Sequence, residues 1–235
     1  MFITGGARRI GRALSLAFAR AGCDVVFTFR NSVEEAASLT QEIAEMGREA
    51  EAIRCDVRDP LSVREAIGEG AEWAGQLDIL INNAGVYYTT AFEDVSVQQW
   101  DEVFETNTRA PFLLAQAAAP QLRANCGRII NIGSLGGIRA WASHAHYCAS
   151  KAALHHLTQV MAKALAPEIA VNAVAPGMIF FPDTEGHDSY KHFAAKTPMQ
   201  RNGTADDVVA ATLFFATCPS FITGQVLAVD GGLGL

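Results

Sequence analysis

The chain consists of short apolar runs that alternate with longer amphipathic segments. Most of the runs are rich in Val and Ile and lack the strict alternation of apolar and polar residues that marks a half-exposed strand. Continuous apolar runs are typical of parallel strands whose two faces are both buried. The pattern predicts strands at residues 2–3, 24–29, 50–55, 77–82, 128–132, 169–174 and 226–229.

The segments between these runs have the spacing of helices. In the first of them Ile10, Leu14 and Phe18 recur at helical intervals, and Gly22 provides a stop signal. Pro60 marks the start of another helix, and Pro167 follows the end of a later one. Beyond the first segment, helices are predicted at residues 33–46, 60–74, 96–123, 145–166 and 204–216.

Alternating strands and helices predict an α/β fold, specifically a Rossmann-type, doubly wound parallel sheet of about seven strands with helices on both faces. No linker or internal repeat divides the chain, so we expect one domain over residues 1–235. The long irregular stretch at 176–202 is predicted to be a substrate-binding loop, because such loops in compact domains are usually functional.

Composition narrows the class of protein. Hydrophobic residues make up 50% and charged residues 18% of the chain, which excludes a disordered or fibrous protein. A net charge of −7 gives no basic patch for nucleic acid, and no apolar stretch is long enough to cross a bilayer. The five cysteines are widely spaced, and no signal peptide precedes the first strand, so we expect a cytoplasmic protein.

Residues 4 to 11 read Thr-Gly-Gly-Ala-Arg-Arg-Ile-Gly and join the first strand to the first helix. Glycines let the backbone turn tightly and approach a phosphate group, and the N–H groups and dipole of the following helix attract the anion. A strand–turn–helix unit of this kind is typical of dinucleotide binding. Arg8 and Arg9 add positive charge, which suits a cofactor with an additional phosphate.

The end of the second strand indicates which cofactor is used. An acid at this place binds the ribose 2′-hydroxyl of NAD, whereas an Arg accommodates the 2′-phosphate of NADP. The chain reads Phe29-Arg30-Asn31-Ser32 here and has no acid. Arg30 can make a charge-assisted contact, and Asn31 and Ser32 can add neutral donors. We therefore predict NADPH.

Tyr147 and Lys151 are four residues apart in a helical segment, so their side chains share one helix face. A neighbouring ammonium stabilises a phenolate, and we therefore expect Lys151 to lower the pKa of Tyr147. Such a phenol can give a proton to a carbonyl oxygen as the carbon accepts hydride. Ser134 ends the preceding strand and can hydrogen-bond the same oxygen. Each residue alone also has a structural interpretation, but their combination favours chemistry.

These residues carry a resemblance to a family. Over essentially its whole length the chain resembles the short-chain dehydrogenase/reductases. The matching elements, in order, are Thr4-Gly5…Gly11, Asp56-Val57, Asn82-Asn83-Ala84-Gly85, Asn107, Ser134, Tyr147-x-x-x-Lys151 and Pro176-Gly177.

The resemblance implies a role for each matched position. Tyr147 would be the general acid, Lys151 would also hold the nicotinamide ribose, and Ser134 would orient the substrate carbonyl. Asn107 would anchor a water in a proton relay through Lys151, and Asp56 would hydrogen-bond the adenine amino group. No catalytic metal is implied. The remaining implied cofactor contacts are Thr4, Gly5, Ile10, Gly11, Val57, Asn83, Ala84, Gly85, Pro176, Gly177 and Ile179.

The chain departs from the family at Arg9, where the usual turn has its middle glycine. This variant resembles the turn of the pteridine reductases, and Tyr87 matches the place of an aromatic residue that stacks on the pterin. Trypanosomatid pteridine reductases, however, carry Asp where this chain has Ser134, which fits ketoacyl-thioester and general carbonyl reductases. Three hypotheses follow: NADPH-dependent reduction of a ketone such as a 3-oxoacyl thioester, which we favour; reduction of a dihydropterin; and a non-catalytic NADP-binding sensor.

Other aromatic and histidine residues complete the expectations. His144 and His146 lack a third partner for metal binding, and His155 and His156 are interpreted as structural residues or subunit contacts. The alanine-rich segment 110–120 and the helix after Tyr147 resemble the family's dimer surfaces, so we expect a homo-oligomer, a dimer or a tetramer. An apolar substrate pocket is predicted from Tyr87, Trp141, Phe180 and Phe181.

Overall fold

The structure is a computed structural model and describes residues 1–181 and 188–235. Seven parallel strands form one sheet in the order β3-β2-β1-β4-β5-β6-β7, which confirms the predicted fold. Each strand lies within two residues of its predicted bounds. The strands are β1 (Phe2–Ile3), β2 (Val25–Phe29), β3 (Ala50–Arg54), β4 (Ile79–Asn82), β5 (Arg128–Ile132), β6 (Ala170–Pro176) and β7 (Val226–Val229).

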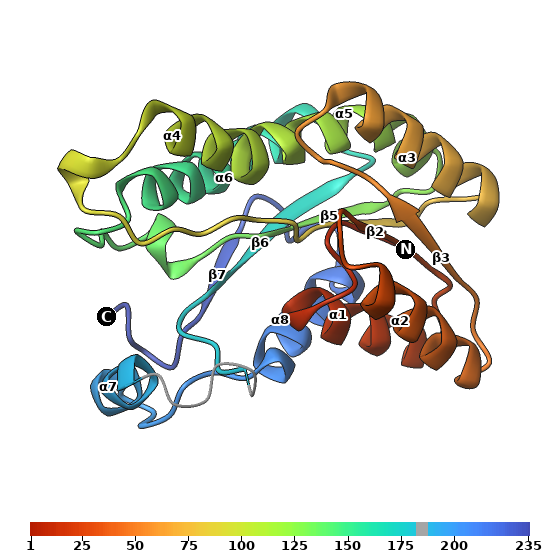
Figure 1. Ribbon diagram of the computed structural model, residues 1–235. Coiled ribbons are helices and arrows are strands. Elements are labelled where there is room, and N and C mark those ends of the chain that lie inside the picture. The colour runs from red at the N-terminus through yellow and green to blue at the C-terminus, as the bar shows by residue number, and fades with distance from the viewer. Residues whose placement is uncertain (182–187) are drawn as a thin grey trace.

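Helices lie on both sides of the sheet (Figure 1). One layer contains α1 (Arg9–Arg20), α2 (Val33–Glu45) and α8 (Ala205–Thr217). The opposite layer contains α3 (Pro60–Ala74), α4 (Val97–Phe104), α5 (Ala110–Ala124) and α6 (Ala145–Ala164). The short helix α7 (Asp188–Lys196) lies apart from both layers, beside the C-terminus in Figure 1.

The core has two parts, one on each face of the sheet. In β1 the side chain of Phe2 packs with Val26 and Leu80 on the α3–α5 side, whereas Ile3 packs with Phe27 on the α1 side. Successive residues of a strand point to opposite faces, so a strand covered on both faces must be apolar throughout. This double burial explains why the strands are readable as continuous apolar runs.

Local signals fix several helix ends. The Asp59 side chain accepts a hydrogen bond from the Leu61 N–H at 2.9 Å and caps α3, whose first residue is Pro60. Gly75 ends the same helix with a φ of 70°. Thr204 forms a reciprocal capping pair with Asp207 at the start of α8.

The predicted helix at 96–123 is interrupted in the structure. A π-helical segment, Glu105–Arg109, separates α4 from α5. Pro111 has no N–H and cannot donate the α-helical bond to the carbonyl of Asn107, four residues earlier. The pattern of apolar residues does not report such a change of helix type, which frequently marks a functional site.

The predicted loop at 176–202 contains structure that the sequence did not place. Helix α7 occupies residues 188–196 of it, and residues 182–187 lie outside the described residues. Among the helices that the structure describes, none is both long and apolar enough to cross a membrane.

Candidate active site

The loops that follow β1 to β6 enclose a cavity of about 1200 Å³. It lies at the carboxyl edge of the sheet and includes the place between β1 and β4 where the strand order reverses, which is where open α/β sheets bind ligands. Predicted cofactor and catalytic residues that line the cavity are Gly5, Arg8, Arg9, Ile10, Gly11, Arg30, Asp56, Val57, Asn83, Ala84, Gly85, Ser134, Tyr147, Lys151, Pro176, Gly177 and Ile179.

Gly5 and Gly11 are among the positions at which the turn between β1 and α1 requires glycine. Gly5 has a φ of 62°, and a Cβ on Gly11 would lie 2.1 Å from the Gly5 carbonyl oxygen. Arg9 adopts a φ of 50°, a left-handed conformation that explains why the family's turn favours glycine at this position. The N-cap Arg8 makes no side-chain capping bond, and Arg8, Arg9 and Ile10 place the N-terminus of α1 in the cavity lining.

Two predicted cofactor residues hold the cavity wall together. The Thr4 hydroxyl accepts hydrogen bonds from the backbone N–H groups of Asn83 and Ala84, at 3.1 and 3.0 Å. The Asn83 side chain donates to the carbonyls of Thr4 and Gly5, at 2.9 and 3.0 Å. Thr4 is buried and lies outside the cavity lining, so in the structure it joins the two neighbouring loops.

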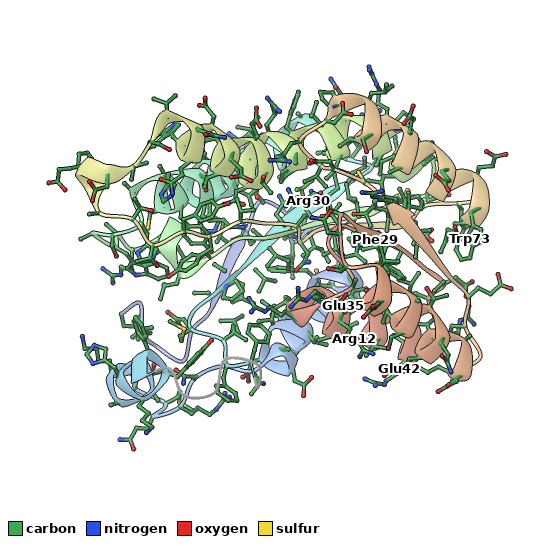
Figure 2. The ribbon with its side chains drawn as sticks, viewed as in Figure 1. Arg12, Phe29, Arg30, Glu35, Glu42 and Trp73 are labelled. Carbon is green, nitrogen blue, oxygen red and sulfur yellow. The ribbon has the colours of Figure 1, made fainter. Side chains whose placement is uncertain are left out.

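Arginines supply the positive charge at one end of the cavity. Arg8 Nε lies 3.4 Å from a carboxylate oxygen of Glu35, and the Arg9 guanidinium lies 5.4 Å from the ring centre of Phe181. Arg30 is exposed at the end of β2, where Figure 2 shows it beside the cavity loops. The predicted phosphate contacts of these arginines stay predictions.

Asn31, Ser32 and Phe180, like Thr4, lie outside the cavity lining. Asn31 and Ser32 follow Arg30, and Ser32 becomes the N-cap of α2, which directs the chain away from the cavity. Phe180, predicted to line the substrate pocket, instead packs edge-on against Tyr190 with ring centres 5.3 Å apart. A neighbouring residue, Phe181, lines the cavity as predicted.

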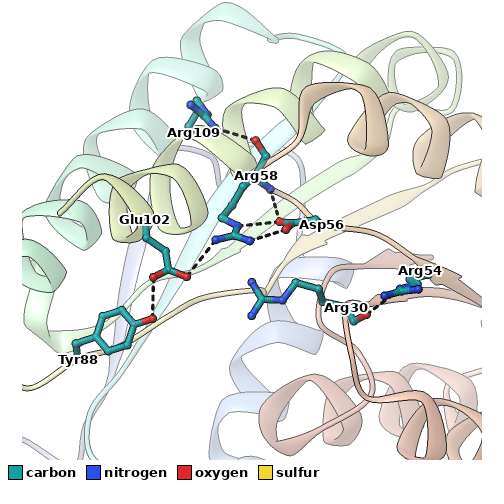
Figure 3. A network of polar contacts seen from close by, with 7 residues as sticks. All are labelled: Arg30, Arg54, Asp56, Arg58, Tyr88, Glu102 and Arg109. Carbon is teal, nitrogen blue, oxygen red and sulfur yellow. Dashed lines mark hydrogen bonds and ion pairs between the residues drawn. The ribbon is translucent and has the colours of Figure 1, made fainter. Parts of the chain in front are cut away.

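A charged network surrounds Asp56 (Figure 3). The Asp56 carboxylate accepts hydrogen bonds from Arg58 Nε at 2.9 Å and Nη2 at 2.6 Å, and these bonds lower the pKa of Asp56 to about 2. Glu102 accepts from Arg58 Nη1 at 3.1 Å and from the Tyr88 hydroxyl at 2.9 Å. The positive charge of Arg30 makes the smallest of the contributions to the same low pKa. Arg58 was not among the predicted site residues, although it follows Asp56 by only two positions in the sequence.

The catalytic candidates meet at the opposite end. Helix α6 carries Tyr147 and Lys151, and Ser134 follows β5. Ser134 and Tyr147 both line the cavity, and the Ser134 hydroxyl lies close enough to lower the pKa of Tyr147, while Lys151 Nζ lies 6.0 Å from the Tyr147 ring centre. Lys151 Nζ donates to the Ile132 carbonyl at 2.8 Å. The structure thus brings the three predicted side chains together.

One sequence prediction about this end is wrong. We expected Lys151 to lower the pKa of Tyr147, but burial raises it to about 12, and the nearby Ser134 hydroxyl opposes that effect only in part. Burial also lowers the pKa of Lys151 to about 8. The sequence shows the spacing of the pair on the helix but not how deeply both groups are buried, and desolvation dominates here.

Asn107 occupies the π-helical segment and lies just behind the cavity lining. Its side chain accepts from the Val86 N–H at 2.9 Å and donates to the Val86 carbonyl and the Ser150 hydroxyl, at 3.0 and 3.1 Å. A Cβ on Gly85 would lie 3.3 Å from Asn107 Oδ1 and 3.6 Å from Lys151 Nζ. Because Gly85 has no side chain, both polar groups lie next to the space that a Cβ would occupy there.

Aromatic rings pack against the ring of Tyr147. The Tyr87 ring packs edge-on against Tyr147 at 4.9 Å, and the Trp141 ring stacks on Tyr147 at 6.4 Å. His144 stacks on Tyr87 at 4.9 Å and lines the cavity, a role that its sequence position did not reveal. Phe193 and other apolar residues from distant segments also line this region, which only the folded chain brings together.

Comparisons with known proteins agree with this geometry. The family described as “Enoyl-(Acyl carrier protein) reductase” matches residues 5–234. The 3-oxoacyl-(acyl-carrier-protein) reductase FabG of Staphylococcus aureus is 35% identical over 236 residues, which cover 98% of this chain and 96% of that protein.

Solved structures share the complete fold. A short-chain dehydrogenase/reductase from Serratia marcescens has a TM-score of 0.95 at 31% identity, covering 100% of this chain and 97% of its own. A blue fluorescent protein from a metagenomic library, solved in complex with NADPH, has a TM-score of 0.93 at 35% identity with the same coverage. The chain therefore belongs to the short-chain dehydrogenase/reductases and is an oxidoreductase that uses a nicotinamide cofactor.

Proposed function

We propose that the enzyme reduces a ketone carbonyl to an alcohol, with NADPH as the hydride donor and Tyr147 as the proton donor. The observation that carries the proposal is that Ser134, Tyr147 and Lys151 line the same side of one cavity, with the Ser134 hydroxyl near enough to lower the pKa of Tyr147. A carbonyl oxygen within reach of both hydroxyls would accept a hydrogen bond from Ser134 and the proton of Tyr147.

The cavity fits a nicotinamide dinucleotide in chemistry as well as in volume. The close approach of Gly5 and Gly11 and the N-terminus of α1 form a cradle for a pyrophosphate, while Arg30 directly follows β2 with no acid next to it in the sequence. Bound there, NADPH supplies the hydride that adds to the carbonyl carbon. The preference for NADPH over NADH rests on the charge of Arg30, Arg8 and Arg9.

The protonation states suit the reducing direction. With a pKa of about 12, Tyr147 carries its proton at neutral pH and is ready to act as an acid. With a pKa of about 8, Lys151 is charged under the same conditions. That charge would stabilise the phenolate that forms when Tyr147 gives its proton to the carbonyl oxygen. Asn107 and Lys151 would then return a proton to Tyr147 through the space beside Gly85.

A dihydropterin is the second candidate substrate. The Tyr87 side chain is 52% exposed, and its ring lies 4.9 Å from that of Tyr147. A flat heterocycle could stack on such a ring with its reducible bond near the Tyr147 hydroxyl.

A substrate panel tests the proposal. Oxidation of NADPH and of NADH would be followed with simple ketones, a 3-oxoacyl thioester, an α,β-unsaturated thioester and a dihydropterin. We expect turnover of ketones, with NADPH preferred. Turnover of the dihydropterin alone would favour the second candidate. Turnover of the unsaturated thioester alone would refute carbonyl reduction, and tight NADPH binding with no turnover of any substrate would favour the sensor.

A further inference from the structure

We propose that His155 is a positioning residue that holds the backbone of Ser134 and thereby sets the place of the Ser134 hydroxyl beside Tyr147. His155 is buried and lies outside the cavity lining, so it acts through Ser134 rather than on the substrate or cofactor. The kinetic consequence rests on the proposed function, in which Ser134 orients a carbonyl. The expected loss of the hydrogen bond at the Ser134 amide does not depend on the proposed function.

The position of His155 on α6 connects it to the catalytic pair. It follows Lys151 by four residues and Tyr147 by eight, so all three side chains leave the same side of the helix. The Ser134 N–H donates a hydrogen bond to His155 Nε2 at 3.3 Å. One helix therefore presents the proton donor, the ammonium and the group that holds Ser134.

The imidazole joins both ends of a short turn. While Nε2 accepts from the Ser134 N–H, Nδ1 lies against the other end of the turn, where a Cβ on Gly137 would be 2.8 Å from it. Between them lies the single 3₁₀ turn Leu135–Gly137, whose Gly136 N–H donates to the Ser134 hydroxyl at 3.0 Å. With Nε2 as an acceptor, the proton of neutral His155 is on Nδ1, toward Gly137.

Glycines make room for the ring. A Cβ on Gly133 would lie 2.2 Å from His155 Nε2, and a Cβ on Gly137 would lie 2.7 Å from Cε1. Both distances are too short for non-bonded atoms, so the turn and the imidazole are mutually fitted. A side chain at either glycine would push the ring away from Ser134.

Charge supports the same arrangement. Burial, together with the positive charge of Lys151, lowers the pKa of His155 to about 4. The imidazole is therefore neutral at neutral pH, which Nε2 requires in order to accept a hydrogen bond. Lys151 is the charged group that faces it from the same helix, and the neighbouring turn contributes the backbone of Gly137.

Removing the acceptor should loosen Ser134. The Ser134 N–H would be left buried without a partner, and the turn could shift to find one. A displacement of about 1 Å in a positioning group can reduce a rate by on the order of 10²-fold. We therefore expect the loss in kcat and not in the affinity for NADPH.

Variants of His155 test the kinetic role. His155→Leu should lower kcat for the best ketone roughly 10- to 100-fold and leave the NADPH Kd within about twofold. His155→Gln, whose amide oxygen can replace Nε2 as acceptor, should retain most of kcat. His156→Leu is the matched control, because the next residue on the helix is exposed, and it should behave as wild type.

The same substitution in a Ser134→Ala variant tests whether His155 acts through Ser134. In Ser134→Ala, which lacks the hydroxyl that is positioned, His155→Leu should lower kcat only slightly further. Equal losses in both backgrounds, or wild-type kcat in His155→Leu, would overturn the proposal. If His155→Leu does not fold, the kcat of His155→Gln is compared with that of His155→Asn. The shorter Asn side chain cannot bring its amide oxygen to the place of Nε2. Equal kcat in those two variants would overturn it as well.

Hydrogen exchange of the Ser134 amide provides a readout that needs no substrate. We expect a protected amide in wild type and in His155→Gln, and faster exchange in His155→Leu, measured by NMR on the protein without ligand. Unchanged protection in His155→Leu would refute the hydrogen bond. A wild-type enzyme that fails to reduce ketones would refute the proposed function while leaving this amide result intact.

Discussion

The two ends of the cavity place their charges in different surroundings. At the arginine end, formed by Arg8, Arg9, Arg30, Asp56 and Arg58, charged groups lie near solvent and several are paired with carboxylates. At the tyrosine end, formed by Ser134, Tyr147 and Lys151, the ionisable groups are desolvated, and burial is the largest cause of their pKa shifts.

This difference indicates which end of the cavity controls cofactor affinity and which controls the reaction rate. Exposed charges act through a screened field and are individually worth little, so they suit recognition of a charged ligand. Buried groups are held in fixed geometry and respond strongly to proton transfer. Substitutions at the arginine end should therefore change cofactor affinity, whereas those at the tyrosine end should change the rate.

The largest effect that separates the two ends is expected from Lys151→Met. It removes the charge that would stabilise the Tyr147 phenolate, and we expect kcat for ketone reduction to fall about 10³-fold. Lys163→Met, an exposed position on the same helix, is the matched control and should keep wild-type kcat. Comparable kcat in the two variants would show that the buried ammonium has no part in the chemistry.

A smaller effect, and one confined to affinity, is expected from Arg30→Asp. The carboxylate would repel the 2′-phosphate and should raise KM for NADPH about 100-fold, while kcat and the KM for NADH change little. Arg12→Gln breaks an ion pair with Glu42 that joins α1 to α2 outside the cavity lining, and it serves as the control (Figure 2). High salt should narrow the difference between wild type and Arg30→Asp. An unchanged preference for NADPH in Arg30→Asp would show that Arg30 does not select the cofactor.

The smallest effect is a pH dependence. Burial lowers the pKa of Lys151 to about 8, so the ammonium is present below that pH and is lost above it. The ratio kcat/KM for NADPH reports the free enzyme and should fall roughly tenfold between about pH 8 and pH 9.5. Lys163→Met should show the same alkaline limb. A ratio that stays constant to pH 10 would contradict the shifted pKa.

The architecture could be predicted from the sequence because its cause is local and repeated. Strands buried on both faces must be apolar throughout, and helix caps such as Asp59 and Thr204 act within a few residues. The π-helical segment at Asn107 was missed, since apolar periodicity does not distinguish a π turn from an α turn. Helix α7 was missed because it interrupts a stretch rich in proline and glycine.

The sequence was sufficient to predict most residues of the site, but only part of their contacts and pKa shifts. The spacing of Tyr147 and Lys151 indicates a shared helix face, yet the sign of the Tyr147 shift depends on burial by segments far away in the chain. His155 was interpreted as structural or as a subunit contact. Its contact with Ser134 exists only because Gly133 and Gly137 leave room for the ring.

The central claim is that Tyr147 gives the proton during carbonyl reduction, and transient kinetics of Tyr147→Phe test it most directly. NADPH would be bound first, its Kd measured by fluorescence, and its oxidation by a saturating ketone followed in a single turnover. We predict a Kd within about twofold of wild type and hydride transfer slowed about 10³-fold, while Tyr88→Phe, outside the cavity lining, stays normal. Hydride transfer in Tyr147→Phe within a few-fold of wild type would contradict the account.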